Sequence, residues 1–188
     1  EFLLWFLPIF LIVYGITPRK YRNLTLLVGS IVFYARGDVR YLPLLMISIL
    51  CNYFLGLHLA KRSPKTLWRK KLLLILTLGA NLAVLLWFKD WGGSAGLPLG
   101  ISFYTFQILS YQIDVYRGEV SREYSFLKFA TYVIMFPKLI SGPITRYGDI
   151  SDSLTERTFT VRGLEDGMKL FILGLAAKVL LADRVGIL

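Results

Sequence analysis

Long apolar runs recur along this sequence, and they constrain its fold more than any other feature. They lie at about 2–16, 21–35, 41–60, 72–90, 97–116, 126–140 and 164–182. A helix needs roughly 20 residues to cross the hydrocarbon core of a bilayer, and most of these runs approach that length. Because backbone polar groups in lipid must be satisfied within the protein, the runs predict about six to seven helices.

Composition supports an integral membrane protein. Hydrophobic residues make up 55% of the 188 positions, and the mean hydropathy is +0.58, which is too apolar for an ordinary soluble domain of this size. The connections between runs are short and contain no low-complexity tract. We therefore predict an all-α polytopic transmembrane bundle that forms a single membrane domain over 1–188.

The net charge of +10 is placed in a way that favours membrane topology over nucleic-acid binding, which we do not expect. Basic residues gather in two connections, the first after run 2–16 and the second after run 41–60. They are Arg19, Lys20 and Arg22 in the first, and Lys61, Arg62, Lys65, Arg69, Lys70 and Lys71 in the second. By the positive-inside rule both connections face the cytoplasm, so the N-terminus is predicted outside.

Polar side chains form a stripe along the run at 97–116. The five residues are spaced three or four apart, and they are Tyr104, Gln107, Ser110, Tyr111 and Asp114. On a helix this spacing places them on one face, and a charged residue facing lipid is costly, so the stripe should face protein or water. Two interpretations remain open. The residues line a polar cavity, or they only hydrogen-bond to neighbouring helices while Asp114 pairs with Arg117.

The stretch "MFPKLISGPITRYGDI", residues 135–150, interrupts an apolar run with helix-breaking residues. Pro137 and Pro143 lack backbone N–H groups, and Gly142 permits a sharp turn or a close approach of two backbones. Broken backbone at membrane depth occurs where it is buried in protein or lines a wet cavity, to which Lys138 and Arg146 would add charge. This pattern predicts a broken or re-entrant helical segment. The alternative is a helix that ends at the interface and continues as a cytoplasmic loop.

Single residues elsewhere give weaker signals. His58 is the one histidine, and no Ser, Asp or Cys arrangement around it suggests a catalytic triad, so we expect an interfacial or packing role. Asn52 and Asn81 lie within apolar runs and are expected to hydrogen-bond between helices. Cys51 is the one cysteine, and the sequence has no metal-ligand cluster, phosphate loop or dinucleotide glycine pattern, so no metal site is predicted.

Three blocks of sequence resemble the membrane-bound O-acyltransferases, in particular the bacterial branch of alginate O-acetyltransferases and their D-alanyl-transferring relatives. The blocks are "RYLPLLMISILCNYFLGLHLAKR", "LPLGISFYTFQILSYQIDVYRGE" and "FLKFATYVIMFPKLISGPITRYGDI". Their order and spacing make the resemblance far more specific than a short motif, and it extends over almost the whole chain.

The resemblance implies an enzyme of the bacterial inner membrane that transfers an acyl group, most simply acetyl, to hydroxyls of an exported polysaccharide such as alginate. The donor would be cytoplasmic, either acetyl-CoA or an acyl carrier, with no bound cofactor, and periplasmic acetylation proteins would be partners. The catalytic histidine of the family is expected beyond Leu188, so no catalytic residue is assigned to this segment, which we interpret as the N-terminal portion of a longer enzyme. A small transporter or channel and a structural membrane subunit are the alternatives.

The same resemblance assigns nine residues of this chain to the wall of a tunnel or substrate path. They are Tyr104, Gln107, Tyr111, Asp114, Pro137, Lys138, Gly142, Pro143 and Arg146. Acyl transfer to a hydroxyl needs a base and donors to the oxyanion, and only the second role is open to residues here, such as Tyr104, Gln107 or Arg146.

Overall fold

The computed structural model describes residues 5–59, 67–91, 96–139, 142, 145–156, 160–178 and 180. Within these ranges every regular element is helical, which confirms the all-α membrane fold. The chain divides into two compact units, Glu1–Thr155 and Glu156–Leu188, which are described separately. That both units form one membrane domain stays a prediction.

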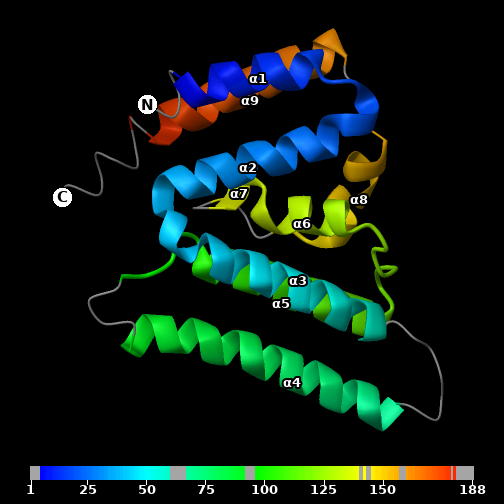
Figure 1. Ribbon diagram of the computed structural model, residues 1–188. Helices are drawn as coiled ribbons and strands as arrows, with labels where there is room; N and C mark the ends of the chain where they lie inside the picture. The colour runs from blue at the N-terminus through cyan, green and yellow to red at the C-terminus, as the bar shows by residue number, and fades with distance from the viewer. Residues whose placement is uncertain are drawn as a thin grey trace. The chain divides into compact units, whose positions relative to one another are not determined.

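The helices of the first unit follow the predicted apolar runs closely (Figure 1). The first four are α1 (Leu7–Ile16), α2 (Arg22–Asp38), α3 (Leu42–Leu59) and α4 (Leu67–Leu86), with the short turns η2 (Arg19–Tyr21), η3 (Val39–Tyr41) and η5 (Trp87–Trp91). They are followed by α5 (Ile101–Arg117), α6 (Phe126–Ile134), α7 (Phe136–Leu139) and α8 (Tyr147–Thr155). Two stretches, Arg19–Leu59 and Trp68–Asp90, contain windows long and apolar enough to cross a membrane.

Helix α5 forms the centre of the first unit. It packs against α3, α4, α6 and α8, and ten of its 17 residues are buried. Glycines with positive φ stand at both of its ends, Gly100 at +67° and Gly118 at +78°. Because residues with a side chain rarely adopt this conformation, the two glycines set where α5 begins and ends.

Contacts between helix ends show that successive helices run in alternate directions. At one end, here called the α8 end, Asn23 Nδ2 at the start of α2 donates to the Leu154 carbonyl of α8 at 2.8 Å. Lys128 Nζ, near the start of α6, donates to Thr155 Oγ1 at 3.0 Å. Arg122 Nη1, just before α6, donates to the carbonyl of Leu57 near the end of α3 at 3.1 Å.

At the opposite end, here called the Gly100 end, the other termini of these helices lie close together. Tyr41 Oη, beside the start of α3, donates to the carbonyl of Gly96 at 3.2 Å, and its ring packs edge-on against Phe88 after α4. A Cβ added at Gly37 near the end of α2 would lie 2.8 Å from Leu99 Cδ2. Helices α2, α3, α4 and α5 therefore pass between the same two ends in alternation.

A reciprocal amide pair joins α3 to α4. Asn52 Nδ2 donates to Asn81 Oδ1 at 3.1 Å, and Asn81 Nδ2 donates to Asn52 Oδ1 at 2.9 Å. On the other side of α3, Gln112 Nε2 of α5 donates to the Asn52 carbonyl at 2.7 Å. The expected interhelical role of both asparagines is confirmed.

The second unit contains α9 (Val161–Ala177), which matches the predicted run at 164–182. Its N-terminus is capped by Thr160, whose Oγ1 accepts from the Gly163 N–H at 3.1 Å. Lys169 and Glu165, one turn apart, form an ion pair at 2.6 Å. Both features are typical of a regular helix.

Candidate functional site

The predicted run at 126–140 is broken into α6 and α7 at Met135. With nine residues and a rise of about 1.5 Å each, α6 is roughly 13.5 Å long and does not cross a bilayer alone. Directly after the break, the Phe136 N–H donates to Ser30 Oγ of α2 at 3.1 Å. Pro137 follows in the first turn of α7, where a missing N–H costs nothing.

The chain then returns toward the end from which α6 started. Leu139 at the end of α7 packs on Gly100, since a Cβ there would lie 2.5 Å from the Leu139 carbonyl oxygen. Eight residues later, the Tyr147 hydroxyl at the start of α8 donates to the carboxylate of Glu123, which precedes α6. The segment therefore reaches the Gly100 end and comes back to the α8 end, which is the geometry of a re-entrant segment.

Gly142, between α7 and α8, comes close to the backbone of Lys138. Its N–H donates to the Lys138 carbonyl at 3.2 Å. A Cβ at this position would lie 3.0 Å from that carbonyl oxygen and closer still to the Lys138 Cα. Only glycine allows this approach, as the sequence predicted.

Three tyrosines from three helices pack around the re-entrant segment. The rings of Tyr111, Tyr132 and Tyr147, here called the tyrosine cluster, have centroids 5.1 to 6.5 Å apart. All three are at most 2% exposed. Tyr132 Oη lies 3.0 Å from the Thr145 carbonyl oxygen and 3.3 Å from that of Gln107. It therefore joins α6 to α5 and to Thr145, which lies between α7 and α8.

Lys138 lies against this cluster and is only 6% exposed. Its Nζ donates to Thr145 Oγ1 at 3.1 Å and lies 4.1 Å from the centroid of the Tyr132 ring. Among the described residues it forms no ion pair. The ammonium group is therefore held by a hydroxyl and an aromatic face, with no counter-charge from the described part of the chain.

The polar stripe of α5 faces the interior of the first unit. Its members Tyr104, Gln107, Tyr111 and Asp114 are each at most 5% exposed. Three of their polar atoms, Tyr104 Oη, Gln107 Oε1 and Asp114 Oδ2, are buried with no hydrogen-bond partner among the described residues. Buried polar atoms are normally paired, so each of these atoms keeps unused capacity for a hydrogen bond. Leu109 is also buried, because α5 is enclosed by four helices.

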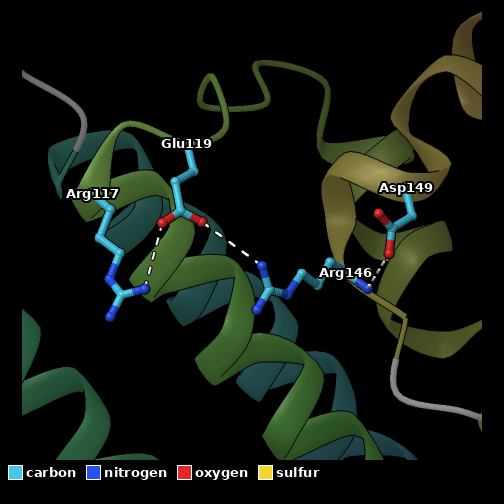
Figure 2. Close-up of polar contacts among 4 residues, drawn as sticks. All are labelled: Arg117, Glu119, Arg146 and Asp149. Atoms are coloured by element: carbon cyan, nitrogen blue, oxygen red, sulfur yellow. Dashed lines mark hydrogen bonds and ion pairs between the residues drawn. The ribbon is translucent and has the colours of Figure 1, made fainter.

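Arg146 occupies the surface of the α8 end. Figure 2 shows its guanidinium directed at Glu119, with Nη1 3.9 Å from Oε2, while Arg117 Nη1 lies 3.4 Å from the other oxygen of that carboxylate. Its backbone N–H donates to Asp149 Oδ2 at 3.3 Å, which caps the start of α8. The pairing of Asp114 with Arg117 is thus not observed, since Glu119 takes that place.

Comparison with known proteins finds O-acetylating enzymes that are similar to this chain over nearly its whole length. The chain is 38% identical to a probable alginate O-acetylase of Pseudomonas putida, over 99% of its own length and 42% of the relative. It is 38% identical to a probable alginate O-acetylase of Pseudomonas aeruginosa, over 100% of its own length and 40% of the relative. A peptidoglycan O-acetyltransferase of Helicobacter pylori is 31% identical, over 97% of the chain and 44% of the relative.

Over nearly its whole length the chain is similar to these O-acetylating enzymes, which agrees with the resemblance to the membrane-bound O-acyltransferases. It spans about two fifths of the length of these curated relatives. No protein-family model and no solved structure matches it.

The structure brings several predicted site residues together and separates others. Gln107, Tyr111, Lys138 and Gly142 meet at the tyrosine cluster and the re-entrant segment. Pro137 is exposed, and Pro143 lies outside the described residues. That any of the nine lines a substrate path stays a prediction.

Sequence reasoning missed three residues at the tyrosine cluster and the re-entrant segment. Tyr132, Thr145 and Tyr147 carry no motif, although Tyr147, Ile150 and Leu154 are spaced as one face of a short helix, which indicates α8. Burial and the hydrogen bond to Glu123 raise the pKa of Tyr147, so its hydroxyl stays protonated and is the donor in that bond.

His58 lies outside this cluster. Its side chain is exposed at the C-terminal end of α3, and Nδ1 lies 2.8 Å from the Phe54 carbonyl oxygen. This contact makes Nδ1 the protonated nitrogen. Across the described residues there is no group of three or more His, Cys, Asp or Glu that could hold a metal ion.

Proposed function

We propose that this chain is part of a membrane O-acyltransferase that transfers an acetyl group from a cytoplasmic donor to hydroxyls of an exported polysaccharide. The single observation that carries the proposal is the similarity to O-acetylating enzymes over nearly the full chain. The re-entrant segment supports it, because broken backbone inside a membrane protein is kept where it borders a buried polar site.

The described helices would supply a wall of that site and not the general base. A hydroxyl nucleophile needs a base close to its proton, whereas the His58 side chain is exposed and its Nδ1 is held by the Phe54 carbonyl. We expect the base to come from the part of the relatives that this chain does not span. Positioning remains important, because displacement of a reacting group by about 1 Å can cost on the order of a hundredfold in rate.

We further propose an inner-membrane location with the α8 end in the cytoplasm. The basic residues Arg19 and Lys20 precede α2 at this end and Arg22 is its first residue, while Arg69, Lys70 and Lys71 lie in the first turns of α4 there. The Gly100 end would then face the exterior, where the polysaccharide and periplasmic acetylation partners would be met. The donor, acetyl-CoA or an acyl carrier, would approach the α8 end.

Cysteine labelling tests this orientation. In a Cys51→Ala background, Lys70→Cys should be shielded from a membrane-impermeant maleimide in intact cells and react after permeabilisation. Leu97→Cys, at the Gly100 end and 56% exposed, should react in intact cells. The reverse pattern would refute the orientation and leave the family assignment untouched.

Acetyl content of the exported polymer tests the activity. The full-length protein is expressed in a host that lacks its own polysaccharide acetylase, and base-labile acetate is measured on the secreted polymer at matched protein amounts. We expect acetylation with the wild type and with Gly79→Ala, whose added Cβ meets open space, and a large loss with Gly142→Ala. A polymer without acetate in every case would favour the transporter or structural alternative.

A further inference from the structure

Helix α4 carries an exposed apolar stripe that begins among basic residues. The helix packs against α3 and α5 at the edge of the first unit (Figure 1). Trp68, Leu72 and Ile75 are spaced four and three residues apart, so they lie on one helix face, and Trp68 is 84% exposed. Leu86, which is also exposed, lies on the same face at the end of the helix. The stripe therefore runs from the first turn of α4 to its last.

Two basic residues flank the start of this stripe. At about 3.6 residues per turn, Arg69 and Lys71 fall on either side of it. Together with Trp68, Leu72 and Ile75 they line a hollow of about 530 Å³. Lys71 Nζ lies 5.9 Å from the centroid of the Trp68 ring. The hollow therefore combines apolar and aromatic surface with two positive charges.

The charges of Arg69 and Lys71 are not balanced by the nearby chain. No Asp or Glu occurs between Asp38 and Asp90, a stretch that contains both α3 and α4. Among the described residues, neither basic side chain forms an ion pair. Lysine is depleted at the core of protein interfaces, whereas anionic lipids attract Lys and Arg beside a membrane surface. The hollow therefore suits a lipid better than a further helix or a second copy of the chain.

We propose that the hollow at the start of α4 binds a phospholipid with an anionic headgroup. Arg69 and Lys71 hold the phosphate by charge-assisted hydrogen bonds, and an acyl chain follows the exposed stripe. Trp68 is suited to the level of the headgroup, where tryptophan is enriched in membrane proteins. The positive-inside rule accounts for basic residues anywhere in this connection, whereas a lipid site depends on which positions carry them. The inference does not depend on acetyl transfer.

Native mass spectrometry of the purified full-length protein tests this site. The protein in detergent is titrated with phosphatidylglycerol and, in parallel, with zwitterionic phosphatidylcholine of the same acyl chains, and the fraction with one bound lipid gives each dissociation constant. A basic residue beside an anionic headgroup contributes about fivefold in affinity, so the wild type should prefer phosphatidylglycerol by at least about tenfold. Combining Arg69→Gln with Lys71→Met should reduce this preference to within about twofold, while phosphatidylcholine binding stays unchanged.

A pair of single variants separates a defined site from general charge attraction. Lys70 is adjacent to Lys71 and carries the same charge, but it does not line the hollow and lies on the side of α4 away from the stripe. Lys71→Met should lower the preference by about fivefold, whereas Lys70→Met should leave it within about twofold of the wild type. Equal losses in these two variants, or a wild type that does not distinguish the two lipids, would overturn the inference. Arg69 and Lys71 are exposed, so their replacement should leave unfolding in SDS unchanged.

Discussion

Replacing Gly100 with alanine tests the close approach of the re-entrant segment to α5. Gly100 has φ +67°, and the new Cβ would lie 2.5 Å from the Leu139 carbonyl oxygen. The left-handed conformation alone costs an alanine about 1 to 2 kcal/mol. Relieving the contact requires movement of backbone, and overpacking of this kind costs about 1 to 3 kcal/mol more. We therefore expect a loss of about 2 to 5 kcal/mol in the free energy of unfolding.

A matched control separates the two contributions. Gly96 also has a positive φ, +78°, but a Cβ there meets nothing within 4 Å. Gly96→Ala should cost only the conformational part, about 1 to 2 kcal/mol. Unfolding of the full-length protein in mixed micelles with increasing SDS, followed by tryptophan fluorescence, measures both. Equal losses in the two variants would show that α7 does not press on α5, and the re-entrant geometry would have to be abandoned.

The remaining predictions concern single polar contacts, each tested on the full-length protein. A double-mutant cycle with Asn52→Leu and Asn81→Leu, measured by the same unfolding assay, should give a coupling of about 0.6 to 1.7 kcal/mol, and additivity would contradict the reciprocal pair. His58→Ala should keep most of the polymer acetylation, because its contact is local; a complete loss at normal expression would restore it as the base. Tyr147→Phe should lower stability by about 1 to 3 kcal/mol, because the Glu123 carboxylate loses a donor, and no change would show that water replaces it.

Much of the membrane fold was predictable because apolar length is a strong signal. The runs at 21–35 and 41–60 became α2 and α3 with shifts of one to three residues at their ends. The run at 126–140 was predicted to be interrupted, but the interruption falls at Met135 and not at a proline. A proline in the first turn of a helix removes no bond, whereas the Ser30 hydroxyl that accepts from Phe136 belongs to a distant helix.

The candidate site was less predictable because it depends on contacts between distant segments. The stripe on α5 follows from helical periodicity, so its burial could be expected. The partner of Arg117 could not be predicted, because Glu119 reaches it only after Gly118 turns the chain at the end of α5. Tyr132 is held in place by its contact with the Thr145 carbonyl oxygen. Nothing in the local sequence indicates where Thr145 will lie.

The paired amides of Asn52 and Asn81 also bear on how the protein enters the membrane. Each side chain also donates within its own helix, Asn52 Nδ2 to the Ser48 carbonyl at 2.9 Å and Asn81 Nδ2 to the Thr77 carbonyl at 2.8 Å. The two bonds between the amides form only when α3 and α4 stand side by side in one register, and a shift by one residue would break both at once. Either helix alone in lipid would expose an amide to hydrocarbon. The two helices are therefore most stable side by side, and we expect them to enter the bilayer as a pair.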